Sequence, residues 1–69
     1  MIIFNVKVHP EQRKAYIPKE VLEAFGCELK LLGCANAAVI WPKDKPLRHV
    51  IESVRLLLKD LEMRLQENE

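Results

Sequence analysis

The chain has 69 residues, of which 49% are hydrophobic and 30% are charged, and its formal net charge is +1. This composition predicts one small globular domain, because the chain is too apolar for a disordered protein and too nearly neutral for a polycation. It contains neither an apolar run long enough to cross a membrane nor a secretory signal, so we expect a cytoplasmic protein with no membrane partner.

The first residues alternate between apolar and polar side chains, with Ile2, Phe4, Val6 and Val8 on one face. This period of two predicts a half-buried strand over Ile2–His9, with its basic side chains turned outward. Pro10 ends the strand, and a polar turn returns the chain to a second strand at Ala15–Ile17. The first unit is therefore a predicted hairpin, with Arg13 and Lys14 at its tip or just after it.

A short amphipathic helix is predicted directly after this hairpin. Pro18 stands at its first position, where a missing N–H group has no helical partner to lose and the fixed φ suits a helix. Val21, Leu22 and Phe25 recur at helical spacing. Gly26 then provides a left-handed stop. A helix of about two turns is too short to be stable alone, so we expect it to pack on a sheet.

A second hairpin is predicted after this helix. Its strands are Leu29–Leu32 and Ala37–Trp41, and the residues between them carry turn signals. Cys27 and Cys34 match no zinc spacing, and about 20 Å of extended chain separates them, which is too far for an internal disulfide. We expect both cysteines to be packing residues.

The longest predicted element is a helix from Leu47 to about Gln66, which follows a polar linker bounded by Pro42 and Pro46. Its apolar residues form one sustained stripe, Leu47, Val50, Ile51, Val54, Leu57, Leu58, Leu61 and Leu65. Two short hairpins and a two-turn helix cover only part of a stripe about 30 Å long. Because monomers avoid such exposed patches, we expect these eight residues to form an oligomer interface. The alternative is that the helix folds back onto its own sheet.

The net positive charge is concentrated near the N-terminus. Residues 1–19 contain four basic residues, Lys7, Arg13, Lys14 and Lys19, against the single acidic Glu11, a local balance of +3. Residues 45–69 carry five basic and five acidic side chains. Any attraction for an anionic partner therefore belongs to the N-terminal part, although a solvated charged surface is the simpler interpretation of such a cluster.

Three further side chains are candidates for nucleic-acid contacts. His9 could join a phosphate contact, although an exposed histidine at a strand end is the simpler interpretation. Tyr16 and Trp41 could stack on bases, but both lie in strand patterns, which favours core or interface anchors.

The stretch Arg13–Gly26, R-K-A-Y-I-P-K-E-V-L-E-A-F-G, resembles the signature of the AbrB/SpoVT-type family of small transcription regulators. That signature is a basic residue, two strand residues, Ile-Pro, a short helix and Gly. The following strand–turn–strand is similar to the family's C-terminal hairpin, so the resemblance covers residues 2–42. The added helix is similar to that of an archaeal branch.

The resemblance implies an α+β fold with a swapped-hairpin β-barrel, in which two chains exchange hairpins. Residues 1–44 would form the DNA-binding domain, and residues 45–69 the helix that assembles dimers or tetramers. The implied function is transcription regulation by a homodimer or homotetramer. The implied DNA-binding residues are the four basic ones, Lys7, Arg13, Lys14 and Lys19.

The sequence also departs from the family pattern. Lys14 takes the place of the usual arginine, and Arg13 stands where the family often has glycine. Leu22 and Glu23 occupy helix positions that are often basic in strong DNA binders. The expected number of phosphate contacts is therefore low, which implies weak or broadly specific binding.

Enzyme chemistry is not predicted. The chain has no cysteine–histidine pair close in sequence, no glycine-rich phosphate loop and only two glycines. We therefore expect no catalytic, cofactor-binding or metal-ligating residues. The rival hypothesis is an antitoxin-type or scaffold protein whose main role is binding a toxin or another protein partner. Related antitoxins use extended acidic tails, whereas the charge-balanced helical C-terminus here favours self-assembly.

Overall fold

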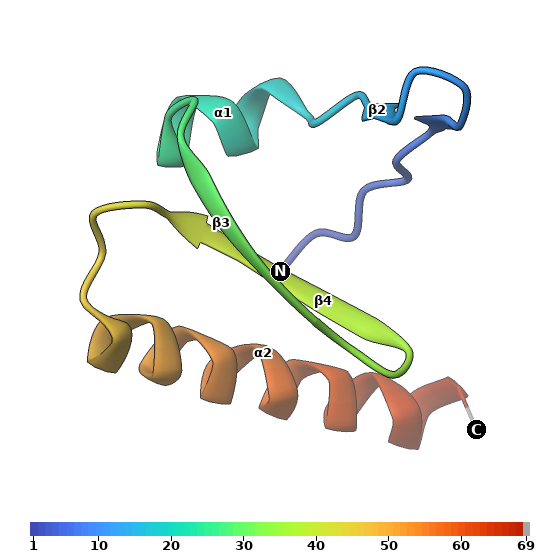
Figure 1. Cartoon of the computed structure of the whole chain (residues 1–69). Coiled ribbons are helices and arrows are strands. Elements are labelled where there is room, and N and C mark those ends of the chain that lie inside the picture. The colour runs from blue at the N-terminus through green and yellow to red at the C-terminus, as the bar shows by residue number, and fades with distance from the viewer. Residues whose placement is uncertain (69) are drawn as a thin grey trace.

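The computed structural model describes residues 1–68, which form an α+β chain of two β-hairpins, a short helix and a long C-terminal helix (Figure 1). In chain order the elements are β1 (Val8–His9), β2 (Lys14–Ala15), α1 (Lys19–Phe25), β3 (Leu29–Cys34), β4 (Ala37–Pro42) and α2 (Leu47–Asn68). Hairpin β3–β4 lies between the first hairpin with α1 on one side and α2 on the other. The α+β prediction is confirmed, and within residues 1–68 of one chain the sheets stay separate and close no barrel. Residue 69, the end of the predicted 45–69 segment, lies outside the described residues.

The first hairpin is much shorter than the sequence predicts. β1 and β2 are antiparallel and pair at only two positions, Val8 with Ala15 and His9 with Lys14. The predicted strand is wrong over residues 2–7, because this stretch has no neighbouring strand to bond with among residues 1–68. The predicted second strand likewise ends before Tyr16 and Ile17. Apolar side chains of the unpaired stretch are left uncovered, with Ile2 78% exposed.

Helix α1 is bounded by the proline and the glycine that the sequence singles out. Pro18 is the N-cap residue and not the first helical residue as predicted, because its ψ of 141° is still extended. Its carbonyl nevertheless accepts the first helical bonds, from Val21 at 3.0 Å and Leu22 at 3.3 Å. Gly26 has a φ of 80° and donates its N–H to the Leu22 carbonyl at 2.8 Å, so the predicted glycine stop with a positive φ is confirmed, while its ψ of −168° is extended and not that of an αL cap.

Hairpin β3–β4 forms where it is predicted, with six antiparallel pairs from Leu29 opposite Pro42 to Cys34 opposite Ala37. Both strands are longer than predicted, because Gly33 and Cys34, which are predicted in the turn, are paired. Ala35 opens the intervening turn with a φ of 50°. Cys27 and Cys34 are both free and exposed, so the prediction that they pack in a core is wrong for the single chain.

Helix α2 begins at the predicted residue and continues two residues past the predicted end. Near its C-terminal end, the Arg64 Nε atom donates to the Asp60 Oδ2 atom at 2.7 Å, and the Arg64 Nη2 atom donates to the Met1 carbonyl. The hydrogen bond from Arg64 lowers the pKa of Asp60 below its ordinary value of 3.8. Within residues 1–68, no helix combines the length and the apolar content that a membrane crossing requires.

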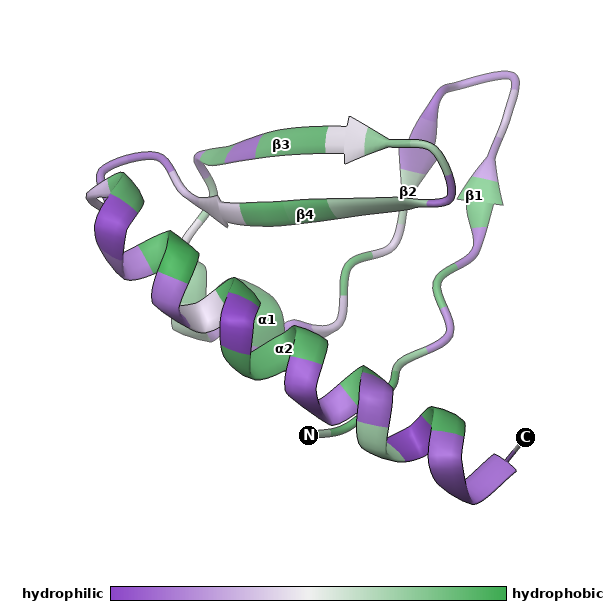
Figure 2. Ribbon diagram, turned by 90° about the horizontal axis from the view of Figure 1, so that it is seen from below, coloured by the Kyte–Doolittle hydropathy of each residue, from purple (hydrophilic) through white to green (hydrophobic). Residues whose placement is uncertain are grey.

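The single chain has no buried core. None of the side chains in residues 1–68 is buried. Apolar residues line both β3–β4 and α2 (Figure 2); those of β3 and α2 are largely exposed, and Val39, Ile40 and Trp41 of β4 are half-buried. The accessible surface is 6753 Å², whereas a folded monomer of this mass exposes about 4,450 Å². The radius of gyration is 13.5 Å, against about 11 Å for a compact domain of this length. The excess of about 2,300 Å² per chain falls in the range that obligate subunits bury.

Candidate nucleic-acid interface

The first hairpin gathers polar and basic side chains on one face. Residues directly opposite each other on paired strands share a face, and successive residues alternate. His9 lies opposite Lys14, and the N–H of Tyr16 donates to the carbonyl of Lys7 at 3.3 Å. These four residues therefore project from the same side, which we call the basic face. Val8 and Ala15 form the apolar face behind it.

An aromatic contact joins the two strands across the basic face. The rings of His9 and Tyr16 meet edge to face, with centroids 5.2 Å apart and planes at 82°. Tyr16 is nevertheless 72% exposed. Its ring borders a surface hollow together with His9, Gln12 and Lys14. An exposed aromatic ring among cations offers a stacking surface for a base beside charges for a phosphate.

The tip of the hairpin is a turn over residues 10–13, closed by the N–H of Arg13 donating to the Pro10 carbonyl at 3.3 Å. Arg13 has a φ of 55°, in the left-handed region that a side chain makes unfavourable by about 1 kcal/mol. Glycine would occupy this position without that strain. The chain therefore holds an exposed guanidinium at its tip in spite of the backbone conformation.

The structure brings together three of the four predicted DNA-binding residues. Lys7 and Lys14 lie on the basic face, Arg13 lies at the adjoining tip, and all three are exposed. Lys19 lies apart, as the first residue of α1, with its Nζ atom 3.6 Å from the Glu23 carboxylate. This exposed pair contributes little to stability, but it offsets the charge of Lys19 toward an anion.

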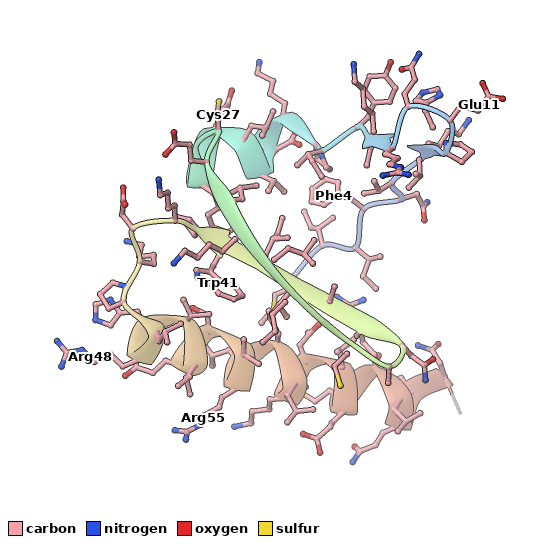
Figure 3. The ribbon with its side chains drawn as sticks, in the orientation of Figure 1. Phe4, Glu11, Cys27, Trp41, Arg48 and Arg55 are labelled. Carbon is pink, nitrogen blue, oxygen red and sulfur yellow. The ribbon has the colours of Figure 1, made fainter. Side chains whose placement is uncertain are left out.

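Sequence reasoning undervalued two residues of the basic face. The sequence pattern favours a core or interface anchor for Tyr16 and a plain strand end for His9. The strand register instead places both on the basic face, with Tyr16 opposite Lys7 and His9 opposite Lys14. The signal was the matched alternation of Lys7 with His9 and of Lys14 with Tyr16. Trp41, by contrast, is half-buried and points toward the space between β4 and α2 (Figure 3), in agreement with a packing role.

The predicted oligomer interface lies along one side of α2. Six of its eight residues are exposed, namely Leu47, Ile51, Leu57, Leu58, Leu61 and Leu65, and the other two, Val50 and Val54, are half-buried. Its apolar surface is therefore largely uncovered in the single chain. Over the described part of the chain, no group of three or more His, Cys, Asp or Glu residues is placed to hold a metal ion.

Substituting Arg13 with glycine removes the guanidinium and relieves the backbone strain, and we expect these two changes to act on different properties. We expect Arg13→Gly to stabilise the folded state by about 0.5 kcal/mol, because relief of the positive φ exceeds the entropy that glycine adds to the unfolded chain. We also expect it to weaken binding to a DNA duplex. The control is Ala35→Gly, which relieves a φ of 50° in the other hairpin and should leave DNA binding unchanged. Thermal unfolding and DNA titration measure both effects, and stronger binding by Arg13→Gly would contradict a role for this cation.

The hairpin thus defines a class of surface, an exposed cationic face with an aromatic ring and a protruding arginine, which suits a polyanion. No protein-family model, no curated protein and no solved structure matches this chain. The case for a function therefore depends on these residues and their arrangement.

Proposed function

We propose that this chain is a cytoplasmic DNA-binding transcription regulator that acts as a homodimer or homotetramer. The observation that carries the proposal is the basic face, where Lys7 and Lys14 flank the His9–Tyr16 pair and Arg13 protrudes beside them. Cations contact phosphates and fix the position of the protein, while an exposed aromatic ring can stack on a base. The strained backbone of Arg13 supports a role for its charge beyond solubility.

The proposed assembly is an AbrB/SpoVT-like swapped-hairpin β-barrel. Residues 2–7 support it, because they have a strand-like sequence pattern and no strand partner in the described part of the chain. Strands of a second copy would supply those hydrogen bonds and would cover the apolar side chains of this stretch. The excess surface of about 2,300 Å² per chain supports the same assembly, because two chains that bury it form an interface of obligate size.

The continuous helix α2 favours self-assembly over the rival function as an antitoxin-type or scaffold protein. A segment that wraps a protein partner is extended, whereas Leu47–Asn68 is one unbroken helix. Its apolar stripe runs the full length of the helix, which suits pairing with an equally long surface. A homodimer would present two first hairpins, each with three cations (Lys7 and Lys14 on the basic face and Arg13 at the tip), and so about six phosphate contacts.

Counterion release gives the test of this function. With about six phosphate contacts, the logarithm of the binding constant should fall with a slope of about −5 against the logarithm of salt concentration. The affinity for a mixed-sequence duplex should therefore drop about 1,000-fold between ~50 and ~200 mM salt, as measured by fluorescence anisotropy. Absence of binding at the lower salt, from protein shown to be folded and oligomeric, would contradict the proposal and favour a function in binding a protein partner.

A further inference from the structure

Helix α2 carries an unbroken apolar seam inside its wider stripe. The seam consists of Leu47, Ile51, Val54, Leu58, Leu61 and Leu65, which alternate at spacings of four and three residues. This is the repeat of the contact positions in a coiled coil. A frame through Val50 and Leu57 is broken by Arg64, but the seam passes beside Arg64 without interruption.

The single chain leaves most of the seam exposed, and Val54 is the one seam residue that is half-buried. Leu47, Leu58 and Leu61 are 64%, 56% and 58% exposed. Val50, which lies beside the seam, is half-buried. With 22 residues the helix is about 33 Å long, so the seam offers about three heptads to a partner of equal length.

The charges of α2 are divided between its two halves. Residues 47–59 contain Arg48, Arg55 and Lys59 against Glu52, a balance of +2. Residues 60–68 contain Asp60, Glu62 and Glu67 against Arg64, a balance of −2. This division opposes the helix dipole, since the first turn has no acidic residue and the last turn no basic one. An isolated α2 therefore has its charges in the less favourable order.

We propose that two copies of this chain pair through α2 in antiparallel orientation along the seam. The proposal rests on the self-association included in the proposed function and specifies its geometry. In this orientation the basic half of each helix lies along the acidic half of the other, and the two helix dipoles oppose each other. A parallel pair would place like charges side by side and would align the dipoles.

The residues at the edges of the seam favour the same orientation. Arg48, Arg55 and Glu62 each follow a seam residue and share one edge, and Arg48 and Arg55 point away from hairpin β3–β4 (Figure 3). In an antiparallel pair centred on the middle of the seam this edge faces its own copy, so Arg48 of one helix meets Glu62 of the other, while Arg55 lies level with its own copy. In a parallel pair this edge would face the opposite edge, formed by Val50, Leu57 and Arg64, which offers no carboxylate.

Spin labels on the outer side of α2 measure the orientation in the full-length protein. Cys27→Ser and Cys34→Ser remove the native thiols, and Gln66→Cys or Lys59→Cys then carries one label per chain. Antiparallel pairing about the middle of the seam offsets the two Gln66 labels by about 30 Å along the axis and the two Lys59 labels by about 9 Å. We therefore expect a clearly longer separation for Gln66 than for Lys59. Equal separations would overturn the antiparallel orientation.

Charge reversal gives an independent readout. Arg48→Glu and Glu62→Arg should each weaken self-association about fivefold to tenfold, and the double reversal should restore it. A double variant that stays as weak as the single ones would overturn the proposed edge contact. Sedimentation of the unaltered chain tests self-association separately from the orientation of the two helices. An oligomer with equal label separations contradicts only the orientation, whereas a folded monomer contradicts the self-association as well.

Discussion

Replacing Leu58 with aspartate is expected to leave the chain unassembled and largely unfolded. The single chain buries no side chain among residues 1–68, so its fold has to form together with the interface. Each substituted chain loses a buried leucine and places a carboxylate in the seam, a loss of about 3 kcal/mol or more. In a dimer this amounts to about 6 kcal/mol, which raises the dissociation constant about 10,000-fold. Sedimentation velocity and far-ultraviolet circular dichroism measure the two consequences.

Leu56 provides the matched control for this substitution. It lies on the same helix, is 61% exposed and projects from the side opposite the seam. We expect Leu56→Asp to keep the mass and the helical signal of the unaltered chain. A folded monomer of Leu58→Asp would contradict the coupling of folding to assembly. If Leu58→Asp stayed assembled, or if both variants lost assembly equally, the seam would not be the interface.

The double variant Arg13→Ala/Lys14→Ala is expected to lose most of its DNA binding. It removes two of the three cations of the first hairpin, and so about four of the six phosphate contacts of a dimer. The slope of the logarithm of affinity against the logarithm of salt should become shallower by about 3.6, and the affinity at ~50 mM salt should fall more than about 10-fold. Fluorescence anisotropy at several salt concentrations gives both quantities.

A second double variant controls for net charge. Lys43→Ala/Lys45→Ala also removes two positive charges, but it removes them from the β4–α2 linker, where Lys43 pairs with Glu28 at 3.7 Å. We expect its affinity and salt slope to stay close to those of the unaltered chain. Equal losses in the two double variants would show a general charge effect and would contradict a site at the first hairpin.

Local sequence patterns predict most of the elements in this fold. Pro18 and Gly26 bound α1, and the spacing of leucines and valines identifies α2 almost to the residue, because both signals act within a few positions of the chain. The alternation over residues 2–9 identifies the two faces of a strand but not its length. A strand forms only beside a partner, and among residues 1–68 the structure supplies one for only Val8 and His9 of this stretch.

The candidate site was predicted only in part for a similar reason. The basic residues are evident from composition, but Tyr16 joins them only through the register of β1 and β2, which depends on the turn at residues 10–13. The left-handed backbone of Arg13 is likewise a property of that turn. The sequence does not distinguish Lys19 from the other three cations, whereas the structure pairs it with Glu23 on α1.

The most direct test of the central claim, that an assembly of this chain binds DNA, is sedimentation velocity of the protein with a labelled duplex at ~50 mM salt. We predict that the duplex sediments with two or four copies of the chain, and that it is released as the salt is raised to ~200 mM. A duplex that sediments alone at the lower salt, beside a folded oligomer, would contradict DNA binding. A duplex bound by single chains would contradict the assembly.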